Sequence, residues 1–172
     1  MFKIALHKDD IDALIRIQTN LNFGKVSLKM NVNLFLKKKK STKEEIKKFI
    51  FIFDRYNLNT TKYLDYIDFN KAFLIYHGRD GLVSQELKEQ ILALKNGMNT
   101  LRSDFNMPPN HQISINKNRL LGLIEGEGSF QLWRKDLVPV FSLVMTEKQL
   151  PVLEKVKEYL INNLGFDSYS IN

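Results

Sequence analysis

Hydrophobic and polar positions follow two different periods along this chain, and one combined pattern occurs twice. Residues 2–6 are a short apolar run followed by polar residues, which predicts a strand and a turn. The segment FKIALHKDDIDALIRIQTNL, from Phe2, aligns without gaps with FSLVMTEKQLPVLEKVKEYL, from Phe141. The chain therefore contains two copies of one strand–turn–helix unit. Apolar residues at helical spacing form a predicted core stripe in each copy: Ile11, Leu14, Ile17 and Leu21 in the first, and Leu150, Leu153, Val156 and Leu160 in the second.

Residues between the two copies carry further strand and helix signals. We expect short strands over 24–27 and 32–36, followed by a helix over 43–56. Ser41 is the expected capping residue of this helix, and Glu44 completes the capping box. Further helices are expected over 62–76 and 84–95, with a break at Gly78, Asp80 and Gly81. Residues 96–117 are rich in Asn and contain two prolines, so they are interpreted as a linker.

The last part of the chain predicts a short apolar helix from Asn118 and strands over 129–133 and 140–145, with a further strand starting in 168–171. The fold class is thus α/β in the α+β sense, with mixed sheets and packed helices. We expect three parts: 1–80, a helix and linker over 81–117, and 118–172. Seven aromatic residues in the predicted helices over 43–56 and 62–76 are expected in the core: Phe49, Phe51, Phe53, Tyr56, Phe69, Phe73 and Tyr76.

Composition narrows the classes of partner. The 172 residues are 44% hydrophobic, which suits a globular core, and 26 Lys and Arg against 19 Asp and Glu give a net charge of +7. This balance favours a polyanionic partner such as nucleic acid. There is no Cys, so a metal would be held by carboxylates and would be Mg-like, and the three widely separated His residues have no zinc-ligand spacing.

Membrane and targeting signals are absent from the sequence pattern. No apolar run approaches the roughly 20 residues that a membrane span needs. Residues 1–10 have neither a signal-peptide nor a transit-peptide pattern, so a soluble, unprocessed protein is expected. Abundant Lys, Asn, Ile, Phe and Leu are typical of an AT-rich coding sequence. We therefore expect an organelle-encoded protein of the mitochondrial matrix.

The nonapeptide LLGLIEGEG, residues 120–128, carries the candidate chemistry. Gly122 and Gly126 lie four positions apart on one helical face, where the missing side chains allow another helix to approach closely. Glu125 and Glu127 stand at the end of the helix, where the helix dipole disfavours carboxylates. A cation would relieve that repulsion, and a carboxylate at the base of a tightly packed helix pair is a plausible Mg²⁺ ligand.

This nonapeptide resembles the signature helix of LAGLIDADG homing endonucleases and intron maturases. The segments FKIALHKDD, FGKV, LNTTKYLDYIDFNKAF and KNGMNTLRSDFNMP also resemble mitochondrial-intron members of that family, in the same order. The resemblance implies paired αββαββα halves whose motif helices pack together, and two saddle-shaped sheets that grip duplex DNA. It also implies that Glu127, and not Glu125, is the metal-binding acid. Lys62 in NTTKYLDY matches the basic residue that organises solvent at the scissile phosphate.

The strand after the motif helix is the first candidate contact with nucleic acid. Residues of the same parity as Glu127 are expected to face nucleic acid, namely Ser129, Gln131, Trp133 and Lys135. Phe130 and Leu132, of the opposite parity, are expected to face the core. A second candidate contact is the run of four lysines, Lys37, Lys38, Lys39 and Lys40, whose binding to phosphates would weaken steeply with salt.

The chain also departs from the family pattern. It contains one motif, resembling the second of two, so both halves are expected to be incomplete and to need a protein partner that covers them. Met145 stands near a position that is often polar, and Arg119 stands where an aromatic residue is common before the motif.

Three functions follow from these observations. The favoured one is a degenerate, catalytically inactive nucleic-acid-binding component of an organellar ribonucleoprotein, such as the mitochondrial ribosome, in contact with rRNA. The second is a Mg²⁺-dependent, site-specific DNA endonuclease completed by a second fragment or by dimerisation. The third is a maturase that binds intron RNA.

Overall fold

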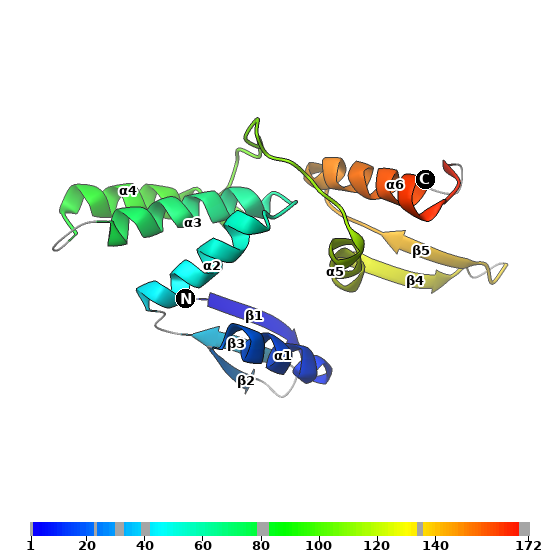
Figure 1. The fold of residues 1–172 in the computed structure, drawn as a ribbon, viewed down its shortest axis with the longest axis horizontal. Helices are drawn as coiled ribbons and strands as arrows, with labels where there is room; N and C mark the ends of the chain where they lie inside the picture. Colours follow the sequence, from blue (N-terminus) through cyan, green and yellow to red (C-terminus); the bar gives the residue numbers. More distant parts are fainter. Residues whose placement is uncertain are drawn as a thin grey trace. The chain divides into compact units, whose positions relative to one another are not determined.

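The computed structural model describes residues 2–22, 24–29, 33–38, 42–78, 83–133 and 136–168. The chain divides into two compact units, Met1–Tyr56 and Asn57–Asn172. This division falls at Tyr56, whereas the sequence pattern suggested a first part of 80 residues. The described residues mix α-helices with antiparallel sheets, which agrees with the expected fold class (Figure 1).

Unit 1 is built on a three-stranded antiparallel sheet with strand order β1-β3-β2. Its strands are β1 (Phe2–His7), β2 (Lys25–Lys29) and β3 (Asn33–Lys38), close to the predicted strands. A 3-10 turn, η1 (Lys8–Asp10), leads from β1 into helix α1 (Ile11–Leu21). Leu14 of α1 is completely buried, and Ile4, Leu6, Ile17 and Val26 pack against it. One helix face and one sheet face therefore form the core of this unit.

Helix α2 (Lys43–Arg55) begins at the predicted residue, but its N-cap lies one residue later than the sequence predicted. Thr42 is its N-cap and accepts a hydrogen bond from the backbone N–H of Glu45, whose side chain accepts one from the backbone N–H of Thr42. The capping box is thus Thr42 with Glu45, and the predicted pair of Ser41 with Glu44 is wrong. Both pairs have the same spacing, and only the backbone conformation selects between them.

The second copy of the repeat lies in unit 2 and has the same succession of elements as the first. Strand β5 (Pro139–Leu143), the 3-10 turn η3 (Glu147–Gln149) and helix α6 (Leu150–Leu164) correspond to β1, η1 and α1. The predicted core stripes are only partly correct. Ile11 is 42% exposed and Leu150 is 52% exposed, because each is the first residue of its helix, directly after the 3-10 turn. Val152 and Val156 are the buried residues of α6.

The rest of unit 2 begins with two adjacent helices, α3 (Lys62–His77) and α4 (Gln85–Asn96), both close to their predicted ranges (Figure 1). A short 3-10 helix, η2 (Asn99–Leu101), and an extended segment follow. The chain continues through α5 (Lys117–Glu127) into β4 (Gly128–Leu132), which pairs antiparallel with β5.

The predicted aromatic core is wrong for several of its members. Phe51, Tyr56 and Tyr76 are each more than half exposed, and Phe69 is 39% exposed. Phe49 and Phe53 are partly buried and stack on each other, with ring centroids 6.3 Å apart. Apolar residues occupy every side of α3, so one packed neighbour cannot bury all of them. The strand predicted to start in 168–171 lies outside the described residues, except for Ser168.

Candidate nucleic-acid interface and metal-binding helix

Helix α5 carries the nonapeptide and turns directly into a strand. The side chain of Asn116 caps its start by accepting hydrogen bonds from the backbone N–H groups of Asn118 and Arg119, at 3.1 and 3.0 Å. The helix ends where Gly128 opens β4. A Cβ atom on Gly128 would lie 2.5 Å from the carbonyl oxygen of Ile124, so only glycine fits this change from helix to strand. Glu127 therefore occupies a fixed place at the junction.

The glycine face of α5 is open. Added Cβ atoms on Gly122 and Gly126 would meet no atom within 4 Å of the described structure, although tertiary contacts surround Leu120, which is buried. Leu121 is 57% exposed. The chain therefore presents a flat helix face with space for a second helix.

Glu125 and Glu127 are both exposed, and neither side chain makes a hydrogen bond or ion pair with a described residue. No group of three or more His, Cys, Asp or Glu side chains is placed to hold a metal ion within the part of the chain that the structure describes. Glu127 alone still fits a hard cation, because Mg²⁺ in nucleic-acid enzymes is bound through one or two carboxylates together with phosphate oxygens. Its assignment as a metal ligand stays a prediction.

Lys62 is the first residue of α3 and is exposed. A cation at a helix N-terminus opposes the helix dipole, so this position does not stabilise the helix. The side chain of Lys62 has no hydrogen-bond or ion-pair partner among the described residues, and no described contact joins it to Glu127. The structure thus places both predicted catalytic side chains on the surface of unit 2, while their role remains a prediction.

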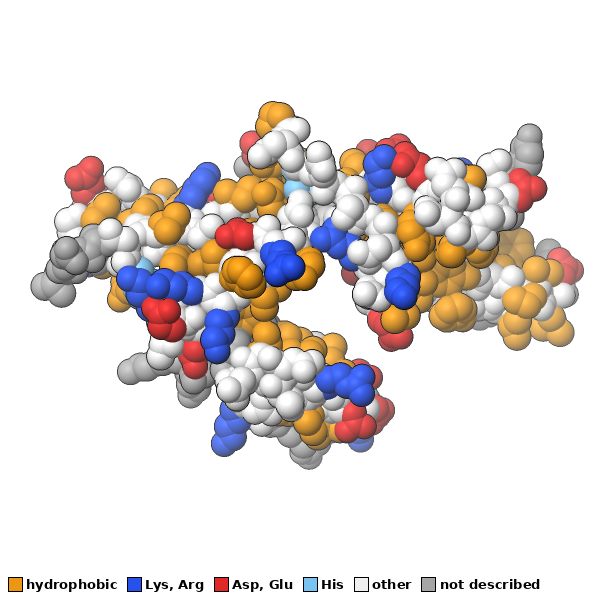
Figure 2. Space-filling view, viewed as in Figure 1, with side chains coloured by type: hydrophobic (Ala, Val, Ile, Leu, Met, Phe, Trp, Pro, Cys, Tyr) orange, Lys and Arg blue, Asp and Glu red, His pale blue; other side chains and the backbone are white. Residues whose placement is uncertain are grey.

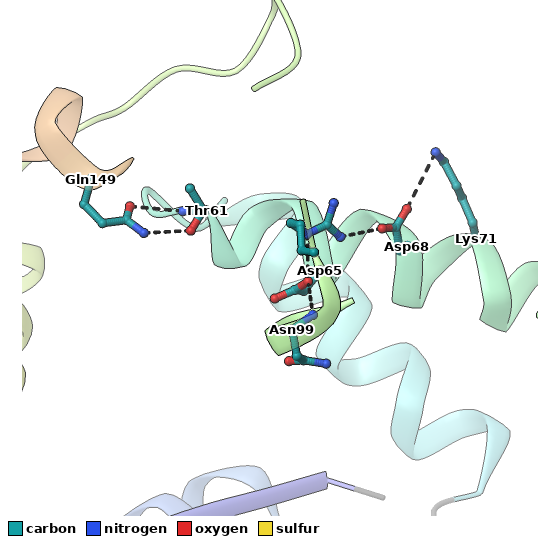
Figure 3. Close-up of polar contacts among 7 residues, drawn as sticks. Thr61, Asp65, Asp68, Lys71, Asn99 and Gln149 are labelled. Carbon is teal, nitrogen blue, oxygen red and sulfur yellow. Dashed lines mark hydrogen bonds and ion pairs between the residues drawn. The ribbon is translucent and has the colours of Figure 1, made fainter. Parts of the chain in front are cut away.

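The residue before Lys62 is held firmly in place. Gln149 accepts a hydrogen bond from the backbone N–H of Thr61 at 3.2 Å and donates one to its hydroxyl at 2.7 Å (Figure 3). Because Gln149 ends η3, these two bonds join the start of α3 to the second repeat copy, 88 residues later. Sequence reasoning missed this contact.

The hairpin β4–β5 places two of the predicted polar residues, Ser129 and Gln131, on the same face. Ser129 pairs with Ser142 and Gln131 with Val140, and the Gln131 amide donates to the Ser129 hydroxyl at 3.0 Å. Ser129 and Gln131 therefore share one face. Trp133, at the start of the turn, is 64% exposed, and Lys135 lies outside the described residues. Contact of this face with nucleic acid is still a prediction.

The opposite face of the hairpin contradicts the expectation of a core. Phe130 is 80% exposed and Leu132 is 61% exposed. Phe130 packs against its cross-strand partner Phe141, with ring centroids 5.0 Å apart. A two-stranded sheet offers too few neighbouring side chains to bury an apolar face. Figure 2 accordingly shows hydrophobic side chains gathered over this hairpin and α6.

The lysine run begins on the central strand of unit 1. Lys37 and Lys38 belong to β3, whereas Lys39 and Lys40 lie outside the described residues. The strand register pairs Lys37 with Lys3 of β1 and with Lys25 of β2. Three lysines thus occupy one row across the sheet, a feature that linear reading missed.

The predicted linker, 96–117, is anchored at several points and is not a free tether. Arg102 donates to Asp65 at 3.0 Å and to Asp68, and the backbone N–H of Asn99 donates to Asp65 at 2.8 Å (Figure 3). The Arg102 side chain is 11% exposed. Burial alone would lower the pKa of this guanidinium, but the hydrogen bonds to Asp68 and Asp65 leave the pKa raised. Farther along, the Lys148 ammonium lies 3.5 Å from the centre of the Phe105 ring.

Arg119 is a second anchor, in a position that the sequence marked as a departure. Its guanidinium donates to the Asn59 side-chain oxygen at 2.9 Å, to the Ser114 carbonyl at 2.9 Å and hydroxyl at 2.6 Å, and to the Asn57 carbonyl at 3.1 Å. The Asn59 amide and the Ser114 backbone also exchange two hydrogen bonds. Arg119 is partly buried, and its two terminal nitrogens make these four hydrogen bonds.

Comparison with known proteins agrees with the sequence resemblance. A family model described as LAGLIDADG endonuclease matches residues 1–73. The chain is 32% identical over 165 residues to the probable intron-encoded endonuclease Cox1-I1b of Schizosaccharomyces pombe. It is 26% identical over 165 residues to the uncharacterized mitochondrial protein RF1 of Saccharomyces cerevisiae. Both matches include 94% of this chain but only 42% and 33% of the two relatives.

The fold is also similar to that of solved proteins. The LAGLIDADG meganuclease I-CpaMI, in a crystal structure bound to uncleaved DNA, superposes with a TM-score of 0.74 at 24% identity. That match covers 96% of this chain and 65% of the meganuclease. The chain therefore has the meganuclease fold over nearly its whole length and spans less than two thirds of each of these proteins. No described helix has the length and apolar character needed to cross a membrane.

Proposed function

We propose that this chain, which belongs to the LAGLIDADG endonuclease family, binds duplex DNA and supplies one acid, Glu127, to a Mg²⁺-dependent endonuclease site. The site would be completed by a second motif helix that docks on the face of Gly122 and Gly126. That helix would come from another part of a longer protein, from a separate fragment, or from a second copy.

The observation that carries the proposal is the combination found on α5. The helix has an open glycine face, and a carboxylate without a protein partner among the described residues stands at its end. Close packing of a second helix against Gly122 and Gly126 would bring another helix end beside Glu127. Two carboxylates together with phosphate oxygens form a donor set that Mg²⁺ accepts.

Glu127 would hold the ion, and a bound Mg²⁺ would supply Lewis-acid stabilisation of charge on the phosphate. Lys62 would donate hydrogen bonds to solvent and phosphate oxygens, a role suited to an exposed ammonium that has no partner among the described residues. Gln149 would restrict the movement of Lys62 by fixing Thr61 directly before it.

Two surfaces support binding to DNA. Ser129 and Gln131 share the polar face of the hairpin, and Gln is a residue that can pair with adenine through two hydrogen bonds. The row formed by Lys3, Lys37 and Lys25 would contact phosphates, which position a protein on DNA without reading its sequence. The meganuclease I-CpaMI was crystallised bound to uncleaved DNA, and we extend DNA binding to this chain as a proposal.

The fluorescence of Trp133 provides a direct test, because it is the only tryptophan in the chain and is 64% exposed. Titration with duplex DNA should change its emission, and Gln131→Ala should weaken binding to the preferred duplex by about 1–3 kcal/mol. Gln90→Ala, on an exposed position of α4, is the matched control and should bind like the unmodified chain. If double-stranded or single-stranded RNA of the same sequence changed the Trp133 emission as much as duplex DNA does, the proposed preference for duplex DNA would be contradicted.

The ribonucleoprotein role predicted from the sequence is a second candidate. Its support is the net charge of +7 and the exposed apolar face of Phe130 and Leu132, which a large assembly would cover. Such a component would need neither Glu127 nor Mg²⁺. A maturase that binds intron RNA would use the same basic surface, and the intron-encoded relative makes that link reasonable. The mitochondrial relative supports a mitochondrial location.

A further inference from the structure

We propose that Arg119 is a positioning residue that holds the motif helix α5 in a fixed orientation relative to the start of α3, and so sets Glu127 relative to Lys62. The functional half of this inference rests on the proposed endonuclease function. The conformational half rests on the hydrogen bonds alone.

The contacts of Arg119 join three separate pieces of unit 2. Its own backbone lies in the first turn of α5, and its guanidinium binds two positions before α3, Asn57 and Asn59, and one position in the anchored segment, Ser114. A planar guanidinium can satisfy several acceptors at fixed angles, whereas a lysine ammonium is a single point charge on a flexible stem. Nη1 makes the bonds to Asn59 and Ser114 and Nη2 makes the bond to Asn57, so one rigid guanidinium holds both segments at once.

The residues that accept hydrogen bonds from Arg119 are themselves held in place. Asn59 accepts hydrogen bonds from Arg119 and from the Ser114 backbone, and its amide donates to the Ser114 carbonyl at 2.9 Å. Close by, the His111 ring lies 4.5 Å from the Tyr63 ring and hydrogen-bonds the Leu58 carbonyl at 2.8 Å. The 57–61 segment is therefore held along its length, and Lys62 directly follows it.

At its other end helix α5 is held by its direct continuation into β4 and by contacts with β5, so Arg119 is the polar anchor of its first turn. Leu120 is the only buried residue of α5 in the described structure, and the face that contains Gly122 and Gly126 meets no neighbour. Glu127 lies eight residues beyond Arg119, or about 12 Å along a helix that rises 1.5 Å per residue. A small rotation of the helix at Arg119 would move the Glu127 carboxylate appreciably. Misplacement of a reacting group by about 1 Å can lower a rate by about 100-fold.

The test uses the full chain with two spin labels. Since the chain has no native cysteine, Lys71→Cys on α3 and Glu125→Cys on α5 give a unique pair of exposed label sites. The distance distribution between the labels should be narrow, and Arg119→Lys should broaden it about twofold by removing the guanidinium geometry. Asn59→Ala, which removes the acceptor side, should give the same broadening. Arg16→Lys, an exposed arginine of α1, is the matched control and should change nothing.

The second readout separates positioning from general stability. In a preparation completed by a second motif helix, Arg119→Lys should lower the single-turnover rate of Mg²⁺-dependent DNA cleavage by about 10-fold to 100-fold. The dissociation constant for DNA should remain within error of that of the unmodified chain, and the variant should stay folded at the assay temperature. A rate that is unchanged despite a broadened distribution, or a distribution that is unchanged in both variants, would overturn the proposal. If the completed preparation never cleaves DNA, the proposed function fails with the functional half of the inference, and the label distances still decide the conformational half.

Discussion

Glu127 and Glu125 are two carboxylates of the same helix end with different expected roles. Both are exposed and neither has a partner among the described residues, so neither is explained by the packing of this chain. Only Glu127 directly precedes the glycine that closes α5, and the family resemblance assigns the metal to it.

Glu127→Gln should therefore abolish Mg²⁺-dependent cleavage while leaving DNA affinity nearly unchanged, because the amide keeps the shape of the side chain but loses its charge. Glu125→Gln should retain cleavage and is the control. The measurement is single-turnover cleavage over a Mg²⁺ titration, combined with a binding titration without metal. Unchanged cleavage by Glu127→Gln would remove it from the site.

Arg102 is the residue whose loss should most destabilise the anchored segment. Its side chain is 11% exposed and pairs with two carboxylates that are each 18% exposed. Arg102→Met should lower the free energy of unfolding by about 2 kcal/mol or more, because it leaves two partly buried acids without their cation. Lys71→Met removes an exposed partner 4.0 Å from Asp68 and should cost less than about 1 kcal/mol. Urea unfolding of both variants measures the contrast, and equal losses would contradict it.

At the scale of elements, α5 is a helix whose glycines lower its own stability. Nothing in the described structure requires the absence of a side chain at Gly126, whereas Gly128 would clash with Ile124. Substitutions at Gly126 and at Gly128 therefore test helix docking and folding separately.

Gly126→Leu should raise the stability of the isolated chain by roughly 0.5–1 kcal/mol, because glycine is a poor helix former. It should at the same time prevent association with a second motif helix, since the new side chain fills the docking face. Gly128→Ala should destabilise the chain, as a backbone carbonyl must shift to admit the methyl group. Thermal unfolding and sedimentation of the variants, with and without the second helix, provide the test. Loss of stability in Gly126→Leu would show that this face is already covered.

Most elements could be predicted from the sequence, because hydrophobic period and capping residues act locally. The repeat identified β1–α1 and β5–α6, and Ser84 marked the start of α4, whereas α5 begins one residue before the predicted Asn118 and is capped by Asn116. The errors arose where distant residues decide the outcome. The exposure of Phe130 depends on which strands and helices cover the hairpin, and the role of Arg119 depends on acceptors about 60 residues earlier. The spacing of residues along the sequence predicts neither the exposure of Phe130 nor the contacts of Arg119. The neighbouring acids Asp65 and Asp68, by contrast, were a local signal for a basic partner, which is Arg102.

At the scale of the whole molecule, the sheet of unit 1 places lysine positions that are far apart in the sequence opposite one another. Strand register, and not sequence proximity, brings Lys3, Lys37 and Lys25 into one row. Any polyanion would interact with that row, so it supports binding to nucleic acid without distinguishing DNA from RNA.

Neutralising Lys37, Lys38, Lys39 and Lys40 should flatten the salt dependence of binding. Each lost phosphate contact should reduce the slope of log affinity against log salt by about 0.9 for duplex DNA, because fewer counterions are released. Neutralising four helix lysines, Lys71, Lys88, Lys95 and Lys155, should leave the slope unchanged. Binding titrations between low and moderate salt measure both sets. Equal slopes for the two sets would make the lysine run an ordinary surface.

We propose that this chain is one part of a DNA endonuclease. The most direct test of this proposal is to purify the tagged chain from its native source without nuclease treatment and to identify the bound nucleic acid. We expect duplex DNA fragments that share one sequence and are cut within it when Mg²⁺ is added. Recovery of ribosomal RNA together with ribosomal proteins, and no enriched DNA site, would contradict it.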